Sequence, residues 1–499
     1  MPKATIRLHP GLRVGAVPAR LFGSFVEHMG RCLYTGIYEP GHPTADADDF
    51  RGDVLALVRE LGVTTVRYPG GNFVSGYRWE DGVGPVDERQ ARLELAWHSV
   101  ETNEVGLNEF MRWVAKAGVE PMLALNLGTR GVEDAVRLLE YANHPGGTEL
   151  SELRRAHGED RPHDIRMWCL GNEMDGPWQI GHKTAAEYGR LAAETARAMR
   201  MLDPGLELVV CGSSSASMRT FGDWESEVLE HTIDLVDHIS LHAYYEPFGD
   251  DVDSFLASGA AMDRFIEDVA AIADAVAARR GVRKRIGLSF DEWNVWKERS
   301  KRAPGPPSEW VRAPAFAEEE YDVTDAVVVG GLLISLLRHV DRVSAACLSL
   351  LTNVSAPIRT VAGGAAWRQT IFHPFALAAA HARGTVLQVA LDAPTITTDR
   401  HGDVPMVDAV ATTTGDELAL FVVNRHRTES VDVQADLAAF GVEGLLDARS
   451  VYDDDPSAVN TAEHPDRVVP RPLKAGVDGG VLRATVPPES FSVLRLAVS

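Results

Sequence analysis

With 499 residues, the chain is long enough for a large catalytic domain and a smaller second domain. Hydrophobic residues make up 45% and charged residues 24% of it, which is typical of a globular protein. A net charge of -23 would repel polyanions, which argues against nucleic acid and anionic membrane surfaces as partners.

The opening residues, MPKATIRLHPGLRVG, contain no apolar signal-peptide core. The longest purely apolar stretch, Ala326–Ile334, is far shorter than the roughly 20 residues that a membrane helix needs. The four cysteines form no CxxC pair, which argues against a zinc knuckle or a redox dithiol. We therefore expect a cytoplasmic protein.

The chain opens on an alternating run, Ala4–Leu8, which predicts a strand that precedes the main domain. Eight short apolar runs with the character of β-strands follow, and most of them precede a segment with apolar residues at helical spacing, such as residues 188–202. The eight runs are Phe22–Glu27, Thr65–Tyr68, Pro121–Asn126, Ile165–Leu170, Leu206–Cys211, His238–His242, Arg285–Phe290 and Ala345–Leu351.

Alternating strands and helices predict parallel strands joined by right-handed crossovers. Eight such units favour a closed barrel over an open doubly wound sheet, since no GxGxxG motif follows the first strand. After about residue 385, helical spacing gives way to alternating segments separated by turn residues, which is typical of an antiparallel sandwich. These segments are Val404–Thr412, Glu417–Val423, Ser430–Val433, Gly480–Val486 and Ser490–Val498.

We therefore predict an α/β fold with two domains. A catalytic (β/α)8 TIM barrel is expected over residues 18–384, and an antiparallel β-sandwich domain over residues 1–17 together with 385–499. The active site of such a barrel lies at the C-terminal ends of its strands. Polar residues at those ends include carboxylates, amides, an imidazole and a phenol without metal-ligand spacing, so we expect a sugar site that needs no metal or cofactor.

Two glutamates stand out among these residues. The fourth run leads into Gly171-Asn172-Glu173, and the seventh leads into Asp291-Glu292. Hydrolysis of a glycosidic bond uses two carboxyl groups that flank the bond, and strands four and seven face each other across a barrel. A single carboxylate at a strand end is as often a helix cap, but the pair favours catalysis.

Other residues near the strand ends suit a sugar pocket. Four tryptophans offer flat faces to sugar C–H groups, although any one of them could be ordinary packing. The turn Pro69–Asn72 lets the backbone approach a ligand. His242 is better suited to positioning a carboxylate by hydrogen bonding than to carrying a proton. The tryptophans are Trp97, Trp178, Trp293 and Trp296.

The chain resembles the α-L-arabinofuranosidases of glycoside hydrolase family 51. The similar stretches occur in the family's order over most of the barrel, and the C-terminal segment resembles the family's β domain. They are Phe22–Arg31, Gly36–Pro40, Arg67–Tyr77, Asn126–Gly131, Trp168–Gly176, His242–Tyr245 and Asp291–Trp296.

The resemblance implies a role for each matched position. It implies a retaining double displacement with Glu173 as acid/base and Glu292 as nucleophile, with Arg67 as a buried positioner that keeps Glu292 ionised. Trp97 and Trp296 are expected as pocket walls. The residues expected to hold the furanose are Glu27, Asn72, Asn172, His242 and Tyr244. The resemblance further implies arabinofuranosyl oligosaccharides as substrates and a homo-oligomer, commonly a hexamer in this family.

One position departs from the family pattern. Three residues before Asn353 the family usually carries a glutamine that contacts the sugar, and this chain has Leu350. The departure leaves related retaining enzymes open, namely a β-D-galactofuranosidase, a β-xylosidase or an endo-glucanase. A non-catalytic carbohydrate-binding protein is the alternative from another class, and the intact glutamate pair argues against it. A closed pocket would favour exo action on terminal residues, and an open cleft endo action.

Overall fold

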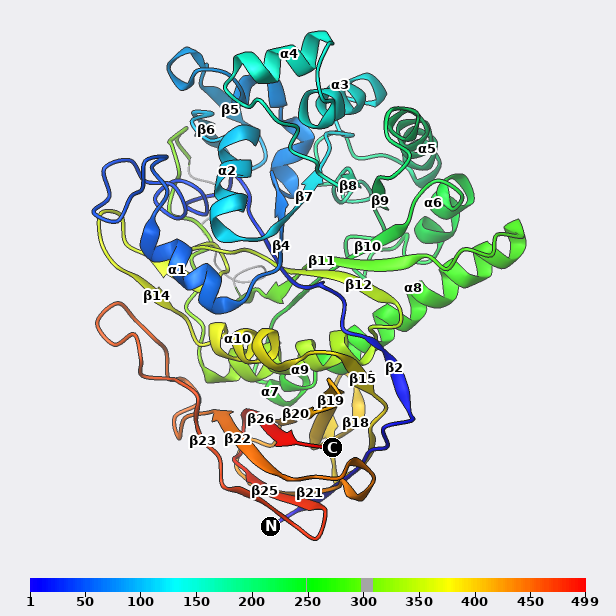
Figure 1. Ribbon diagram of the computed structural model, residues 1–499, viewed down its shortest axis with the longest axis vertical. Helices are drawn as coiled ribbons and strands as arrows, with labels where there is room; N and C mark the ends of the chain where they lie inside the picture. The colour runs from blue at the N-terminus through cyan, green and yellow to red at the C-terminus, as the bar shows by residue number, and fades with distance from the viewer. Residues whose placement is uncertain (248, 298–307) are drawn as a thin grey trace.

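The computed structural model describes residues 1–247, 249–297 and 308–499, and its centre is a closed barrel of eight parallel strands (Figure 1). Around the barrel, each strand is hydrogen-bonded to the next in the order β10-β11-β12-β3-β4-β7-β8-β9. Every one of the eight predicted runs forms a barrel strand, so the predicted fold class is confirmed. The strands are β3 (Arg20–Phe25), β4 (Thr65–Tyr68), β7 (Glu120–Ala124), β8 (Met167–Leu170), β9 (Glu207–Val210), β10 (His238–Tyr245), β11 (Gly287–Val295) and β12 (Val343–Leu348).

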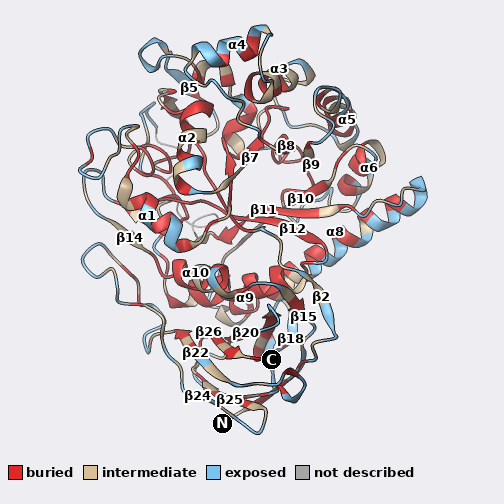
Figure 2. Ribbon diagram, in the orientation of Figure 1, coloured by how far each residue is buried: buried red, intermediate tan, exposed pale blue. Residues whose placement is uncertain are grey.

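The barrel strands are short and largely buried, as Figure 2 shows by their colour. All residues of β4 and β8 are buried, because side chains fill the barrel on one face and helices cover the other. β10 and β11 extend further than predicted, since they continue to pair from His242 opposite Glu292 to Tyr245 opposite Val295. Asp291 and Glu292 therefore lie inside β11 and not at the strand end where the sequence placed them.

Helices surround the barrel on its outside (Figure 1). α9 (Val323–Arg338) is buried over most of its length because it packs against two domains. On one side it contacts β11 of the barrel, and on the other β19 (Val407–Thr413), β20 (Glu417–Asn424) and β26 (Ser490–Ala497) of the second domain. No helix among the described residues is long and apolar enough to cross a membrane. The helices are α1 (Gly52–Leu61), α2 (Leu107–Ala117), α3 (Val132–Asn143), α4 (Glu149–Ala156), α5 (Ala185–Leu202), α6 (Asp223–Thr232), α7 (Val252–Leu256), α8 (Gly259–Arg280), α9 (Val323–Arg338) and α10 (Phe372–His381).

Two further sheets pack face to face below the barrel in the view of Figure 1. One has the order β16-β1-β21-β25-β24 and the other β2-β15-β19-β20-β26-β22-β23. The strands are β1 (Lys3–Arg7), β2 (Arg13–Ala16), β15 (Thr385–Leu387), β16 (Ala390–Asp392), β19 (Val407–Thr413), β20 (Glu417–Asn424), β21 (Val431–Asp436), β22 (Gly444–Val451), β23 (Arg471–Pro472), β24 (Ala475–Asp478), β25 (Val481–Val486) and β26 (Ser490–Ala497).

The pairing in these sheets is antiparallel except between β1 and β21, which run parallel. The alternating run at the N-terminus therefore adds a strand to the C-terminal sandwich, as its pattern suggested. The predicted segment Val404–Thr412 is divided, because β18 (Gly402–Pro405) forms a separate hairpin with β17 (Thr395–Thr398) while β19 pairs with β20. The division of the chain at residues 17 and 385 stays a proposal.

Charged residues lie at the N-terminal ends of the barrel strands. Arg20 at the start of β3 forms hydrogen bonds with Glu120 of β7 (2.8 Å from Nε) and Glu207 of β9 (2.7 Å from Nη1). His238 at the start of β10 lies 3.5 Å from Glu207. The bond with His238 and the pairing with Arg20 lower the pKa of Glu207 to about 2. The network therefore links the starts of four strands at the end of the barrel opposite the predicted site.

We expect Glu207→Gln to lower the unfolding temperature at pH 7. Because the network is partly exposed, the free energy of unfolding should fall by about 1 kcal/mol or less. A carboxylate with a depressed pKa stabilises the fold above its ordinary value of 4.5, and this contribution is lost as the pH falls from there to about 2. Thermal unfolding of both proteins across this range should show the gap closing. A gap of the same size at pH 3 and pH 7 would contradict the assignment.

Candidate active site

The two predicted glutamates lie on opposite sides of the C-terminal mouth of the barrel. Glu173 follows β8, the fourth strand from β3, and Glu292 lies in β11, the seventh. The turn after β8 is sharp: Glu173 has a φ of 44°, in the left-handed region that few residues other than glycine adopt. That turn lets the Glu173 side chain approach Glu292.

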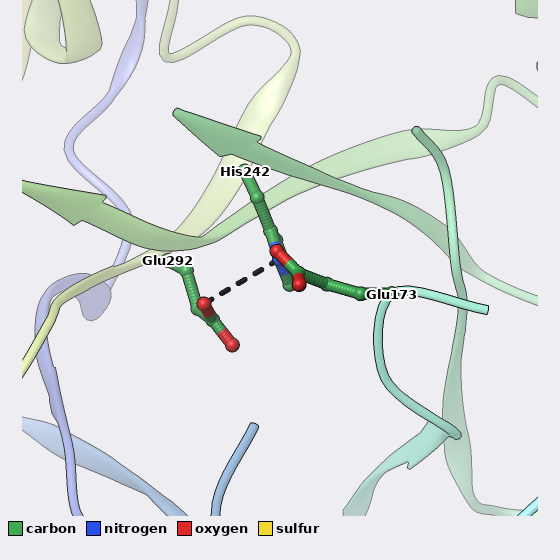
Figure 3. A group of neighbouring side chains, drawn as sticks. All are labelled: Glu173, His242 and Glu292. Carbon is green, nitrogen blue, oxygen red and sulfur yellow. Dashed lines mark hydrogen bonds and ion pairs between the residues drawn. The ribbon is translucent and has the colours of Figure 1, made fainter. Parts of the chain in front are cut away.

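The carboxylates lie close together. One oxygen from each glutamate and one ring nitrogen of His242 lie within 4.8 Å of one another, and Figure 3 shows the three side chains converging. Retaining glycosidases hold their carboxyl groups about 5 to 5.5 Å apart, whereas inverting enzymes leave about 6.5 to 9.5 Å for a water molecule. The spacing therefore fits direct attack by a carboxylate.

Glu292 is held by a guanidinium and a phenol. Arg67 donates from Nη1 to Glu292 Oε1 at 2.8 Å and from Nη2 to Asn172 Oδ1 at 2.6 Å. Tyr244 donates from its hydroxyl to Glu292 Oε2 at 2.9 Å. Each oxygen of Glu292 is thus oriented by a separate donor, which fixes the carboxylate plane before a substrate arrives.

His242 lies between the acidic residues. Its Nδ1 is 3.0 Å from Glu173 Oε1 and 3.6 Å from Glu292 Oε2, and its Nε2 is 3.0 Å from Asp291 Oδ1. Burial lowers the pKa of His242, but the charge of Glu292 and the hydrogen bonds with Asp291 and Glu173 outweigh it and raise the pKa to about 10. Burial raises the pKa of Glu292, and the cationic His242 and Arg67 limit that rise.

A cavity of about 270 Å³ opens beside the pair. It is smaller than the roughly 300 to 1,000 Å³ typical of pockets for drug-sized ligands, so it suits one small sugar ring and part of the next group. Of the predicted site residues, Glu27, Asn72, Trp97, Glu173, Tyr244, Glu292, Trp296 and Leu350 line it. Arg67, Asn172 and His242 do not line it: Arg67 and His242 form hydrogen bonds with the lining residues Glu292 and Glu173, and Asn172 accepts a hydrogen bond from Arg67.

Glu27 and Trp97 form one wall of the cavity. Trp97 Nε1 and the backbone N–H of Phe73 each donate to Glu27 Oε1 at 2.9 Å. Burial raises the pKa of Glu27 to about 8, so this carboxyl is largely protonated at neutral pH and can donate to a sugar hydroxyl. A Cβ on Gly70 would lie 2.4 Å from Glu27 Cγ, which explains the glycine in the turn before Asn72.

Several cavity residues were not predicted as site residues. Met29, Val354 and Ser355 line the cavity without a sequence signal of their own, and Gly71 lines it within the turn Pro69–Asn72 that was expected to approach a ligand. Trp178, predicted only to lie near a strand end, lines the cavity and donates from Nε1 to Glu173 Oε2 at 2.6 Å. Trp293 from the same prediction is fully buried outside the cavity lining.

Among the described residues, Glu173, His242 and Glu292 are the group whose spacing would admit a metal ion. These residues have no metal-ligand spacing in the sequence, and the fold brings them together from the turn after β8 and from β10 and β11. Each of them already has a partner of complementary chemistry, namely Trp178 for Glu173, Asp291 for His242 and Arg67 for Glu292. We assign the group to acid-base chemistry.

Family models and curated relatives that are described as α-L-arabinofuranosidases match this chain, and together the matches span the whole chain. The family model "Alpha-L-arabinofuranosidase 1 domain" matches residues 57–258, and "Alpha-L-arabinofuranosidase C-terminal domain" matches residues 291–490. An intracellular exo-alpha-(1->5)-L-arabinofuranosidase from Streptomyces lividans is 56% identical over 100% of this chain and 76% of that protein. An exo-alpha-(1->6)-L-arabinofuranosidase from Bifidobacterium longum is 54% identical over 97% of this chain and 95% of that protein.

A solved structure is similar over the same span. The family 51 alpha-L-arabinofuranosidase from Bifidobacterium longum has a TM-score of 0.95 and 48% sequence identity, and the match covers 99% of this chain and 100% of that one. The similarity therefore includes both the barrel that carries the two glutamates and the sandwich beside it.

Proposed function

The chain belongs to the α-L-arabinofuranosidases of glycoside hydrolase family 51, and from this premise we propose how its residues divide the reaction. The enzyme is a retaining exo-α-L-arabinofuranosidase, which releases terminal non-reducing arabinofuranosyl residues. We assign the nucleophile to Glu292 and the acid/base to Glu173. The observation that supports this assignment most is the approach of the two carboxylates to within 4.8 Å.

In the first step, Glu292 attacks the anomeric carbon as its bond to the leaving oxygen breaks, and Glu173 gives its proton to that oxygen. Arg67 and Tyr244 hold both oxygens of Glu292, so little reorientation is needed before attack. Trp178 contacts Glu173 Oε2, which places this oxygen at the edge of the cavity. The products of the step are a glycosyl ester on Glu292 and the free alcohol.

In the second step, Glu173 removes a proton from a water molecule, which attacks the same carbon and frees Glu292. Esterification of Glu292 removes its negative charge, so repulsion no longer disfavours the ionised form of Glu173. Two inversions at the anomeric carbon give net retention. Both steps use the same pair of carboxyl groups, which flank the anomeric carbon from opposite sides of the barrel mouth.

The family does not determine which glycosidic linkage the enzyme cleaves, because the two curated relatives carry different linkages in their names. We propose α-(1→5)-linked arabino-oligosaccharides as substrates, by similarity to the Streptomyces lividans protein. That protein is described as intracellular, which supports the same location here. The predicted homo-oligomer stays a prediction.

The proposed function is tested by initial rates on 4-nitrophenyl glycosides and on arabinobioses with 1→5 and 1→6 linkages. We expect the α-L-arabinofuranoside to exceed the β-D-galactofuranoside, β-D-xyloside and β-D-glucoside, and the 1→5 disaccharide to exceed the 1→6. Preference for another glycoside would contradict the assigned glycone. Preference for the 1→6 disaccharide would contradict only the assigned linkage.

Leu350 lines the cavity with methyl groups that cannot hydrogen-bond a sugar hydroxyl. We expect Leu350→Gln to have a higher kcat/KM on the arabinofuranoside than Leu350→Met, which has similar length but no amide. One added hydrogen bond of about 1 kcal/mol corresponds to a factor of about five. If the methionine variant is the faster of the two, the cavity does not place a hydroxyl near this position.

A further inference from the structure

Asp291 is a fully buried carboxylate that the double displacement does not use. Its side chain lies beside the nucleophile in β11, with 0% exposure. Asp291 Oδ1 is 3.0 Å from His242 Nε2, and Asp291 Oδ2 is 3.7 Å from Cys169 Sγ and 3.8 Å from Arg67 Nε. Burying an ionised group is costly, so a carboxylate that persists here needs compensating partners. His242 supplies a short hydrogen bond to Asp291, and the thiol of Cys169 supplies a weaker one.

The hydrogen bond from His242 fixes how the ring carries its protons. Burial raises the pKa of Asp291, but Arg67 and His242 outweigh it and lower the pKa below its usual value, so Asp291 accepts and Nε2 carries a proton. The opposite nitrogen, Nδ1, then faces Glu173 Oε1 at 3.0 Å. If Nδ1 also carries a proton, it donates to Oε1, and the acid proton of Glu173 must reside on Oε2.

Oε2 is the oxygen of Glu173 that contacts the cavity wall. It accepts the hydrogen bond of Trp178, which lines the cavity, whereas Oε1 is directed towards the buried ring of His242. A proton on Oε2 is available to the leaving oxygen. A proton on Oε1 would be directed at His242 and away from the substrate.

The charges of the site balance when Asp291 is ionised. Arg67 and the doubly protonated His242 are positive, Asp291 and Glu292 are negative, and Glu173 is then neutral as the acid step requires. Other titratable groups near these residues are Glu27 and Tyr244 at the cavity and the buried thiols Cys169, Cys211 and Cys347, and burial raises the pKa of each of them, so they are largely neutral near pH 7. Asp175 also interacts with Glu173; burial raises its pKa to about 6, and its negative charge above that pH favours the neutral form of Glu173.

We propose that Asp291 is a positioning residue for the acid step, acting through His242: it keeps the ring doubly protonated and thereby directs the acid proton of Glu173 to Oε2. Neither Asp291 nor His242 forms or breaks a covalent bond with the substrate in this scheme. The proposal rests on the assignment of Glu173 and Glu292 above and adds the groups that hold the acid in its working form.

The test is the pH dependence of kcat/KM for Asp291→Asn, which preserves shape and removes the charge. Without that charge the site loses its working proton more easily, so the basic limb should move to lower pH by at least about one unit. The loss of rate at pH 7 should be larger on arabinobiose than on the 4-nitrophenyl glycoside, since the nitrophenolate leaves with little need for an acid. Cys169→Ala, which removes a neighbour of Asp291 but no charge, should leave the basic limb in place.

A double variant separates direct from indirect action. If Asp291 works through His242, Asp291→Asn should move the basic limb no further in a His242→Gln background. An unmoved limb in Asp291→Asn, or an equal shift in both backgrounds, would overturn the proposal. Wild-type activity on the arabinofuranoside and its loss in Glu292→Ala test the proposed function separately, so the two failures are distinguishable.

A measurement on the unmodified protein remains valid even if Asp291→Asn does not fold. Nitrogen NMR of the histidine-labelled enzyme, with His242→Gln to assign the signal, reports whether both ring nitrogens carry protons. We expect the doubly protonated form of His242 to persist at pH 8, consistent with its pKa of about 10. A neutral ring at that pH would overturn the proposal.

Discussion

Replacement of Glu292 by alanine is expected to abolish turnover of arabinofuranosides, with a loss on the order of 10⁴-fold or more, as when a covalent nucleophile is removed from other hydrolases. The loss should be as large for the 4-nitrophenyl glycoside as for arabinobiose, because no leaving group compensates for a missing nucleophile. The two Arg67 hydrogen-bond donors would then lose one of their acceptors. The measurement is kcat/KM of both substrates for the purified variant.

Azide provides the control for this variant. A small anion can occupy the space left by the Glu292 carboxylate and attack the anomeric carbon, which restores turnover of the activated glycoside and gives the azide product with inverted configuration. Glu27→Ala is a matched variant, because it removes another buried carboxyl of the same cavity. If azide rescued Glu27→Ala and not Glu292→Ala, the nucleophile would be wrongly assigned.

Replacement of Glu173 by alanine is expected to lower kcat/KM by an amount that depends on the leaving group of the substrate. Loss of general acid catalysis costs about 10²- to 10⁴-fold, and arabinobiose should lose the full amount because its sugar alcohol leaves poorly without a proton. The 4-nitrophenyl glycoside should lose much less in kcat/KM, since its first step needs little protonation. Equal losses on both substrates would contradict the acid role.

The second step distinguishes Glu173 from a residue that only shapes the cavity. Without a base the ester on Glu292 hydrolyses slowly, so kcat and KM of the 4-nitrophenyl glycoside should fall together. Trp178→Phe removes the hydrogen bond to Glu173 Oε2 but keeps the acid, so it should show a milder loss without this joint fall. A joint fall in Trp178→Phe of the same size would indicate that the cavity wall, and not the carboxyl, controls the second step.

The barrel could be predicted from the sequence because its strands are buried apolar runs separated by helical patterns. Strand ends were less accurate, since the extension of β11 through Glu292 depends on pairing with β10, a contact between segments far apart in the chain. Short edge strands such as β23 (Arg471–Pro472) carry little local pattern and were missed. The sandwich was predicted from its alternating segments, including the N-terminal strand.

In the site too, residues with a local sequence pattern could be predicted, and contacts between distant segments could not. Glu173 and Glu292 have strong local signals, because each follows an apolar run and lies in a motif that resembles a known family. Asp291 was visible only as the neighbour of Glu292, and its contact with His242 depends on how β10 and β11 are placed together. The cavity residue Met29 is an ordinary apolar residue in sequence, and only the fold brings it to the cavity that Glu173 and Glu292 line.

The most direct test of the account is to trap the covalent intermediate. Glu173→Ala mixed with 4-nitrophenyl α-L-arabinofuranoside should accumulate the glycosyl-enzyme, because the ester forms from an activated substrate and lacks the base for its hydrolysis. Intact-protein mass spectrometry should then show one added pentosyl group, and peptide mapping should place it on Glu292. A modified residue other than Glu292, or release of the inverted sugar without any adduct, would contradict the double displacement assigned to this pair.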